Sequence, residues 1–237
     1  MEDLESKLQS IPDTAGKLIV TDGVFSMRGD ICRLLEIVEL AEKYGARILV
    51  DDAHGFGVLG PGGRGTAAHF GLQDKVDITM LTFSKSLASI GGCMLSSKKI
   101  YDFVAHSSRP FIFSASITPC SAATALAALQ QLEKDPERPT RLKNISQYFR
   151  TKLIDSGVNI IEAPTPIVPI FTYQTYDTLW YGKALFEEGV YVNPVIAPAC
   201  VESECLLRTT LMATHTEPII DEAVEIISRV LKEKPNF

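Results

Sequence analysis

The chain has 237 residues, and its 23 lysines and arginines against 29 aspartates and glutamates give a formal net charge of −6. With 46% hydrophobic and 22% charged residues, this is the composition of an ordinary globular protein, which excludes a disordered chain, collagen and a coiled-coil rod. The acidic balance, without a dense cluster of lysine and arginine, argues against nucleic acid or an anionic membrane as the main partner. A small-molecule ligand is the better expectation.

The sequence also bears on location. No apolar run approaches the roughly 18 residues that a membrane-spanning helix needs, and the first ten residues (MEDLESKLQS) are acidic and polar. We therefore expect a cytoplasmic protein with no membrane span. The cysteines form no CxxC pair and are predicted to be reduced thiols, most of them buried. They are Cys32, Cys93, Cys120, Cys200 and Cys205.

Short apolar runs alternate with amphipathic stretches, which is typical of an α/β protein with a largely parallel sheet. Gly45 is a natural C-terminal stop for the first clear amphipathic helix. In chain order, the first part is predicted to contain a helix at 2–9, a strand at Lys17–Thr21, a helix at Leu34–Tyr44, strands at Ala46–Val50 and Ile78–Thr82, and a neighbouring strand around IGGCML.

A long helix rich in small residues is predicted at Thr118–Leu132, and Pro136 and Pro139 follow it. We place a domain boundary there, so that residues 1–135 form a larger domain and residues 136–237 a smaller α+β domain. The elements expected in the second domain are helices at Arg141–Ser156, Tyr176–Glu187 and Pro218–Lys232, and strands at Ile167–Tyr173, Val190–Asn193 and near Leu206–Leu211.

Lys85 lies just after a predicted strand, between the hydroxyl residues of the segment TFSKS. Most lysines are solvated, so a surface position is the plain interpretation. The alternative is a lysine that forms a Schiff base, whose amine is made reactive by desolvation and neighbouring charge. The residues around Lys85 leave both interpretations open.

Asp51 and His54 form a DxxH motif at the end of the preceding predicted strand. A carboxylate beside a pyridine-type nitrogen keeps that nitrogen protonated, which makes the ring of pyridoxal phosphate an electron sink, and an imidazole can bond the ring hydroxyl. A capping aspartate and an ordinary loop histidine are the plain alternative. Because polar residues at the carboxyl ends of parallel strands face one crevice, we expect Asp51, His54 and Lys85 to converge.

The segment Gly55–Gly60 also matches the GxGxxG pattern of dinucleotide-binding proteins. In those proteins the glycines open a helix that holds the pyrophosphate, whereas here they run into Pro61, Gly62 and Gly63. We therefore predict no dinucleotide site. The isolated histidines of the chain have no partners at ligand spacing, so we also predict no metal site.

Three consecutive segments, TDGVFSMRGD, VDDAHGFGVLGPGGRG and TFSKSLASIGG, resemble signatures of the α-oxoamine synthases, a family of fold-type I pyridoxal-phosphate enzymes. FIFSASITP and LLRTTLMATHT also fit, so the resemblance covers nearly the whole chain in order. TFSKS with ASIGG is most similar to the bacterial serine palmitoyltransferase branch, with aminooxononanoate synthase and aminoketobutyrate CoA ligase as relatives. The resemblance implies the PLP-dependent transferase fold, with an incomplete, mainly parallel large domain and a small C-terminal α+β domain.

The resemblance implies a role around pyridoxal 5'-phosphate for each matching residue. Lys85 would bond the cofactor and transfer the substrate α-proton, and Asp51 would pair with the ring nitrogen. His54 and Ser26 would contact the ring hydroxyl. Thr82 would donate a hydrogen bond to the cofactor phosphate.

Other matches concern substrates and partners. Ser114 and Ser116 lie in the segment that in this family reaches the cofactor phosphate of the other subunit, which implies a homodimer with shared active sites. Arg208 would hold the amino-acid carboxylate, with His215 in support. The implied reaction condenses an amino acid, with serine favoured, with an acyl-CoA and releases carbon dioxide to give an α-amino ketone, as in sphingolipid or biotin biosynthesis.

The sequence departs from the family pattern in places. Asp22 stands where many members have glutamate, and Cys93 where the palmitoyltransferase branch usually has an aromatic residue. The family's chains begin well before the position that matches Met1, and that segment carries a phosphate-binding loop and a histidine that stacks on the ring. A catalytically inactive fragment that only dimerises is therefore the alternative. A fold-type I aminotransferase is disfavoured because that group typically has a tyrosine where His54 stands.

Overall fold

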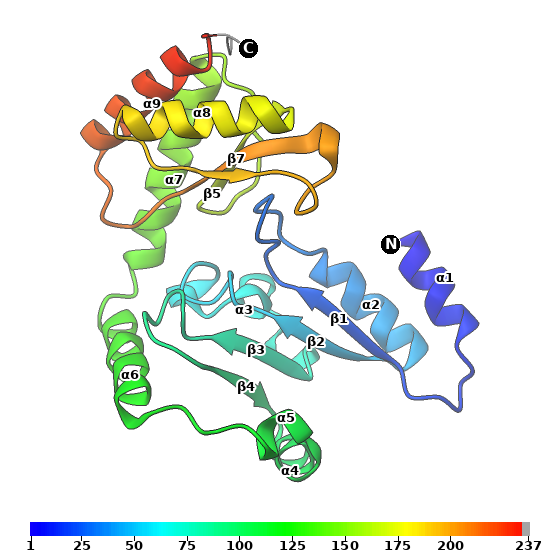
Figure 1. Cartoon of the computed structure of the whole chain (residues 1–237). Coiled ribbons are helices and arrows are strands. Elements are labelled where there is room, and N and C mark those ends of the chain that lie inside the picture. Colours follow the sequence, from blue (N-terminus) through cyan, green and yellow to red (C-terminus); the bar gives the residue numbers. More distant parts are fainter. Residues whose placement is uncertain (234–237) are drawn as a thin grey trace. The chain divides into compact units, whose positions relative to one another are not determined.

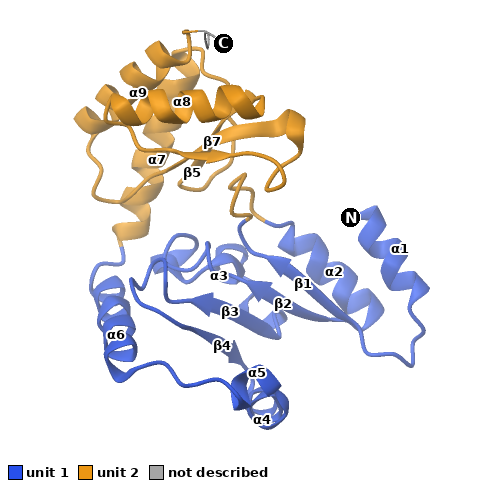
Figure 2. Cartoon of the chain, viewed as in Figure 1, with its two compact units in different colours: residues 1–24, 32–136 blue, residues 25–31, 137–237 orange. Residues whose placement is uncertain are grey.

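The structure is a computed structural model that describes residues 1–233 (Figure 1). The chain divides into two compact units, coloured separately in Figure 2. Unit 1 comprises Met1–Val24 and Cys32–Pro136, and unit 2 comprises Phe25–Ile31 and the chain from Glu137 onward. The short segment at 25–31 thus belongs to unit 2, although it lies within the range expected for the first domain. No helix in the described part of the chain is both long and apolar enough to cross a membrane.

Unit 1 is an α/β unit built around one sheet (Figure 1). Its strands are β1 (Leu18–Asp22), β2 (Arg47–Asp51), β3 (Ile78–Thr82) and β4 (Gly92–Ser96). Its helices are α1 (Glu2–Ser10), α2 (Leu34–Tyr44), α3 (Thr66–Phe70), α4 (Lys98–Ser107), α5 (Arg109–Ile112) and α6 (Pro119–Lys134), with short 3₁₀ turns η1 (Pro61–Gly63) and η2 (Gln73–Lys75).

The sheet of unit 1 has the order β1-β2-β3-β4. The first three strands are parallel, and β4 pairs antiparallel with β3. The register places Asp22 beside Asp51 and Asp51 beside Met80. Because β1, β2 and β3 run in the same direction, their carboxyl ends meet at one edge of the sheet, where binding sites of parallel sheets form.

Helix α2 covers one face of β1 and β2. It ends as predicted at Gly45, which adopts a left-handed conformation with φ of 64° and donates its N–H to the carbonyl of Ala41. The buried face of α2 packs on Ile19 of β1 and on β2. On the opposite face of β1, Leu18 and Val20 are 55% and 63% exposed. An apolar strand of this kind is typical of a sheet covered on both faces, so this face is suited to contact with further protein.

Unit 2 is an α+β unit with a sheet in the order β5-β7-β6, in which both pairs are antiparallel. Its strands are β5 (Ile167–Tyr173), β6 (Asn193–Val195) and β7 (Cys205–Thr210). Its helices are α7 (Arg138–Asp155), α8 (Thr175–Glu187) and α9 (Glu217–Val230), and η3 (Glu202–Glu204) precedes β7.

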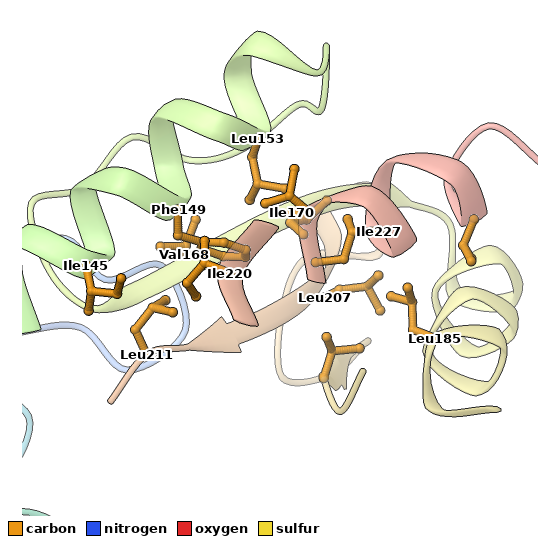
Figure 3. Packing of buried hydrophobic residues seen from close by; sticks show 13 residues of the cluster. Ile145, Phe149, Leu153, Val168, Ile170, Leu185, Leu207, Leu211, Ile220 and Ile227 are labelled. Atoms are coloured by element: carbon orange, nitrogen blue, oxygen red, sulfur yellow. The ribbon is translucent and has the colours of Figure 1, made fainter. Parts of the chain in front are cut away.

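The core of unit 2 lies between this sheet and its helices (Figure 3). Helix α9 contributes Ile220, Val224 and Ile227, which follow each other at helical spacing and are at most 5% exposed. They pack with residues from α7, α8 and the strands, among them Phe149, Leu153, Val168, Leu185 and Leu207. The buried residues of α9 recur at helical spacing, so one side of this helix faces the core of unit 2.

The structure corrects one predicted strand. The strand expected at Val190–Asn193 begins at Asn193, as β6. After α8 the chain first turns at Gly189, with φ of 89°, and Val190 donates its N–H to the carbonyl of Leu185. Those residues close the helix, so pairing with β7 starts only where Asn193 lies beside Arg208.

Candidate functional site

The carboxyl ends of the parallel strands in unit 1 carry three of the polar residues that the sequence singles out. Asp22 ends β1, Asp51 ends β2 and Thr82 ends β3. Asp22 and Asp51 are register partners, and the N–H of Gly23 donates to the carbonyl of Asp51 at 2.7 Å. Lys85 follows in the loop after β3. The strand order thus brings residues from distant parts of the sequence to one edge.

The charges at this edge interact. Burial and the neighbouring Asp51 carboxylate raise the pKa of Asp22, whereas the positive charge of Lys85 lowers it. The structure therefore brings Asp51 and Lys85 close enough to act on a common neighbour. Two carboxylates and one amine therefore act on each other at this edge of the sheet.

His54 follows Asp51 in a turn. The Asp51 carboxylate accepts a hydrogen bond of 3.0 Å from the N–H of Ala53, through Oδ1, which fixes its orientation. His54 is half-buried and lies in the next turn of the chain. Both members of the DxxH motif are thus on one short, well-defined connection at the end of β2.

The neighbouring Asp52 ties this connection to the start of α3 through hydrogen bonds with Thr66. It is only 2% exposed, and its carboxylate accepts hydrogen bonds from the N–H and the hydroxyl of Thr66 at 2.8 and 2.6 Å. A Cβ atom on Gly55 would lie 2.0 Å from Oδ1 of Asp52, and a Cβ atom on Gly65 would lie 1.9 Å from Oδ2. Burial raises the pKa of Asp52. No motif in the sequence assigns a role to Asp52, and the glycines at 55 and 65 are the available signal for it.

Thr82 lies with other hydroxyls in the loop after β3. Its Oγ1 lies 2.9 Å from Oγ of Ser84 and 3.4 Å from the carbonyl oxygen of Gly91. Ser84 and Lys85 are exposed and Thr82 is half-buried. Hydroxyl donors of this kind, next to an amine, suit an anionic group such as a phosphate.

Ser114 and Ser116 lie between α5 and α6, where residues 111–120 are all exposed. The same stretch carries exposed aromatic and aliphatic side chains, with Phe111 63% and Phe113 83% exposed. Polar and apolar groups are thus both presented outward from this part of unit 1.

In unit 2, Arg208 is on the central strand β7 and is half-buried. Its Nε donates a hydrogen bond of 2.6 Å to the carbonyl oxygen of Ser26. Burial lowers the pKa of Arg208, but arginine remains charged at any physiological pH. The structure therefore joins two residues that the sequence analysis assigned to different domains.

The segment around Ser26 is held in unit 2 by further contacts that the sequence analysis missed. Thr165 donates its hydroxyl to the carbonyl of Gly29 at 2.9 Å, and the buried Arg150 donates to the carbonyl of Thr165 at 2.7 Å. Gly29 has φ of 75°, and a Cβ there would lie 2.7 Å from the Thr165 hydroxyl. No sequence motif signals these contacts, because the Thr165–Gly29 bond joins residues 136 positions apart and the Arg150–Thr165 bond ends on a backbone carbonyl.

His215 has a local role. Its Nδ1 accepts a hydrogen bond of 3.2 Å from the N–H of Met212, which closes the turn after β7. Within residues 1–233, no group of three or more His, Cys, Asp or Glu side chains is arranged to hold a metal ion.

Comparison with known proteins gives the family. The model of the aminotransferase class I and II family matches residues 1–227. The chain therefore belongs to the aminotransferase class I and II family.

Relatives within this family carry more specific names. The chain is 48% identical to a serine palmitoyltransferase of Sphingobacterium spiritivorum and 41% identical to an 8-amino-7-oxononanoate synthase of Thermosipho melanesiensis. Each alignment covers 98% of this chain, but only 58% and 60% of the relative. The chain thus spans about three fifths of the length of the curated relatives it matches.

Solved structures confirm the predicted fold. A serine palmitoyltransferase of Sphingomonas wittichii matches with a TM-score of 0.93 and 33% identity, over 98% of this chain and 58% of that one. Another serine palmitoyltransferase structure, which contains PLP, gives the same TM-score at 34% identity. The predicted PLP-dependent transferase fold, with a mainly parallel sheet and a small α+β part, is therefore confirmed.

Proposed function

We propose that the protein is a PLP-dependent acyltransferase that condenses an amino acid with an acyl-CoA and releases carbon dioxide. The carrying observation is the meeting of Asp51, Thr82 and the Lys85 loop at the carboxyl ends of adjacent strands. These groups suit PLP, because the cofactor presents a basic ring nitrogen, a reactive aldehyde and a phosphate. The relatives named serine palmitoyltransferase and 8-amino-7-oxononanoate synthase support the same reaction class.

When bound, PLP supplies an electron sink for negative charge that develops on the α-carbon of an amino acid. In our proposal Asp51 holds a proton on the ring nitrogen, and His54 donates to the ring oxygen. Thr82 donates its hydroxyl to the phosphate. Lys85 holds the cofactor through its amine and moves the proton at the α-carbon of the substrate, a role that needs a lysine next to neutralising charge.

In unit 2 we propose that Arg208 binds the substrate carboxylate. Its Nε is occupied by the carbonyl of Ser26, which orients the guanidinium plane and leaves the terminal nitrogens to donate to a carboxylate. The same hydrogen bond holds the backbone at Ser26, whose hydroxyl we assign to the ring oxygen of the cofactor.

We propose serine and a long-chain acyl-CoA as the substrates, because relatives at 48% and 47% identity are serine palmitoyltransferases. A homodimer with shared active sites is part of the proposal, and the exposed Ser114 and Ser116 are its expected contribution to the neighbouring site. The cytoplasm is the proposed location, since all five cysteines are free thiols, as is usual in a reducing compartment.

The first test is a visible absorption spectrum of the chain with added PLP, followed by borohydride reduction and mass mapping of the labelled lysine. We expect a band from PLP bonded to a lysine, with the label at Lys85. Lys85→Ala should abolish the band, and Lys99→Ala, which changes an exposed lysine of α4, should leave it intact. Labels scattered over surface lysines would contradict the cofactor site.

The second test is turnover. The chain is incubated with PLP, a long-chain acyl-CoA and serine, alanine or glycine in turn, and released carbon dioxide and free CoA are measured. Equal amounts of both products, highest with serine and absent in Lys85→Ala, are expected. Conversion of the amino acid to its 2-oxo acid, with the amino group passed to an added 2-oxo acid and no loss of carbon dioxide, would instead indicate an aminotransferase.

A second candidate function is that this chain is an inactive folded piece that only self-associates. The favouring observation is the exposed apolar surface of unit 1, which includes Val20 at 63%, Phe103 at 70% and Phe113 at 83%. Sedimentation distinguishes the candidates together with the spectrum. Self-association without a Lys85-bound PLP band supports this candidate, and a dimer with that band supports the acyltransferase.

A further inference from the structure

The residue after Lys85 joins the two loops on which the proposed chemistry depends. Ser86 donates its hydroxyl to the carbonyl oxygen of Phe56, with an Oγ–O distance of 2.7 Å. This is the usual length of a well-formed O–H···O hydrogen bond. Phe56 lies two residues after His54. The bond therefore joins the loop that carries Lys85 (residues 83–91, the lysine loop) to the loop that carries His54 (residues 52–65, the histidine loop), across thirty positions of the sequence.

The two loops also touch at Gly57. A Cβ atom at this position would lie 2.4 Å from both Cβ and Oγ of Ser86. The φ angle of Gly57 is 78°, a conformation that favours glycine. The absence of a side chain at Gly57 is therefore what lets Ser86 reach the backbone of the histidine loop.

The histidine loop is itself held by several hydrogen bonds. The N–H of Gly57 donates to the carbonyl of Gly63 at 2.7 Å, and Phe56 forms an isolated β-bridge with Arg64. The buried pair of Asp52 and Thr66 holds the base of the same loop. Ser86 is thus attached to backbone that has its own hydrogen bonds.

The lysine loop has contacts of its own, among them the buried side chain of Leu87, which is 5% exposed. Its ends are tied by backbone hydrogen bonds from Phe83 to the carbonyl of Gly91 and from Ser89 to the carbonyl of Phe83. Between them Lys85 and Ser86 are exposed, and Ala88 has a left-handed φ of 49°, which is strained for a residue with a Cβ. The Ser86 hydroxyl holds the middle of this loop, next to Lys85.

We propose that Ser86 is a positioning residue for Lys85, which it serves by fastening the lysine loop to the histidine loop. The inference rests on the proposed function, because it concerns the placement of the Lys85 amine. Proton transfer depends steeply on placement, and a displacement of about 1 Å can reduce a rate by about 100-fold. Ser86 itself touches neither cofactor nor substrate in this proposal.

The test compares three variants of the whole 237-residue chain. Ser86→Ala removes the hydroxyl, and Ser86→Thr keeps it. Ser89→Ala is the matched control, because Ser89 lies in the same loop and donates a bond of the same 2.7 Å length, but to the carbonyl of Ser121. The control separates a general loss of loop stability from the loss of the link to Phe56.

The first readout is hydrogen exchange of the chain without PLP. Ser86→Ala should speed amide exchange at least about threefold in both 83–89 and 52–60, whereas Ser89→Ala should do so only in 83–89. Ser86→Thr should restore the slow exchange of 52–60. Unchanged exchange of 52–60 in Ser86→Ala would overturn the inference.

The second readout is the binding of PLP to Lys85. It is measured as the PLP concentration that gives half of the visible band, as the pH at which the band changes, and as the yield of Lys85 labelled with PLP after borohydride reduction. Ser86→Ala should raise the half-saturating PLP concentration by about 3- to 10-fold and shift the pH midpoint of the band, with Ser86→Thr near wild type. Values for Ser86→Ala that equal those for Ser89→Ala would overturn the positioning role. If wild type itself forms no Lys85-bound band, the proposed function fails for this chain, and the exchange result alone decides whether Ser86 fastens the two loops.

Discussion

The Nε of Arg208 donates a 2.6 Å hydrogen bond to the backbone carbonyl of Ser26, which lies 182 positions earlier in the chain. The bond joins the central strand of unit 2 to the short segment at 25–31. It also fixes which nitrogens of the guanidinium remain for a ligand. A lysine cannot reproduce this arrangement, because its ammonium is a point charge on a flexible stem rather than a planar fork.

Arg208→Lys should therefore weaken binding of an amino acid to the PLP-loaded chain. Loss of charge-assisted hydrogen bonds of about 1.5–3 kcal/mol corresponds to roughly 10- to 100-fold. A titration with serine, followed through the visible band, measures the change. Arg229→Lys, in an exposed ion pair with Glu188, should stay within about twofold of wild type. Equal affinities for Arg208→Lys and wild type would remove Arg208 from the substrate site.

Two leucines of helix α8, one buried and one exposed, allow a controlled test of the core packing of unit 2. Leu185 is fully buried, whereas Leu179 on the same helix is 46% exposed. Leu185→Ala should lower the free energy of unfolding by about 2–5 kcal/mol, because it removes buried methyl groups and leaves a cavity. Leu179→Ala should cost less than about 1 kcal/mol. Urea unfolding followed by fluorescence of Trp180, the one tryptophan of the sequence, reports on this unit, and equal losses would contradict the packing of α8.

Because Asp52 is buried, we expect the free energy of unfolding to depend on pH. Burial raises the pKa of Asp52 in the folded state above its ordinary value of 3.8. The folded state then binds the proton more tightly than the unfolded state, so the contribution of this group is full below about 3.8 and is lost as the pH rises through the folded pKa. The stability of wild type relative to Asp52→Asn should accordingly fall as the pH rises from about 4. Urea unfolding of both proteins by circular dichroism at several pH values measures the difference, and a constant difference would contradict it.

The cysteines should differ strongly in reactivity. Burial raises the pKa of Cys32 to about 11, and this residue is 4% exposed. A hydrogen bond with the hydroxyl of Thr118 lowers the pKa of the exposed Cys120 below its ordinary value of 9.0. Because the thiolate is the reactive form, iodoacetamide at pH 8 should modify Cys120 at least about 100-fold faster than Cys32. Peptide mass mapping over time tests this order, and Thr118→Val should slow Cys120 alone.

Much of the fold could be predicted from local patterns. The helix at Leu34–Tyr44 and the strands at Ile78–Thr82 and Ile167–Tyr173 have the expected bounds, because apolar spacing, a terminal glycine and β-branched runs act within a few residues. Asp51 and Lys85 were identifiable for the same reason, since each lies just past a recognisable strand. The start of β6 could not be predicted in this way, because pairing with β7 decides where that strand begins.

Sequence by itself determined the kinds of element, their order and the chemical groups at the strand ends, since these follow from side-chain type and spacing along the chain. Only the tertiary structure decided that Ser26 belongs with Arg208, that Asp52 lies buried against Thr66, and that Ser86 reaches the carbonyl of Phe56. Each of these contacts joins residues distant in sequence through a hydrogen bond to a backbone group or a buried hydroxyl. Every residue offers such groups, so no local pattern of side chains specifies which of them will meet.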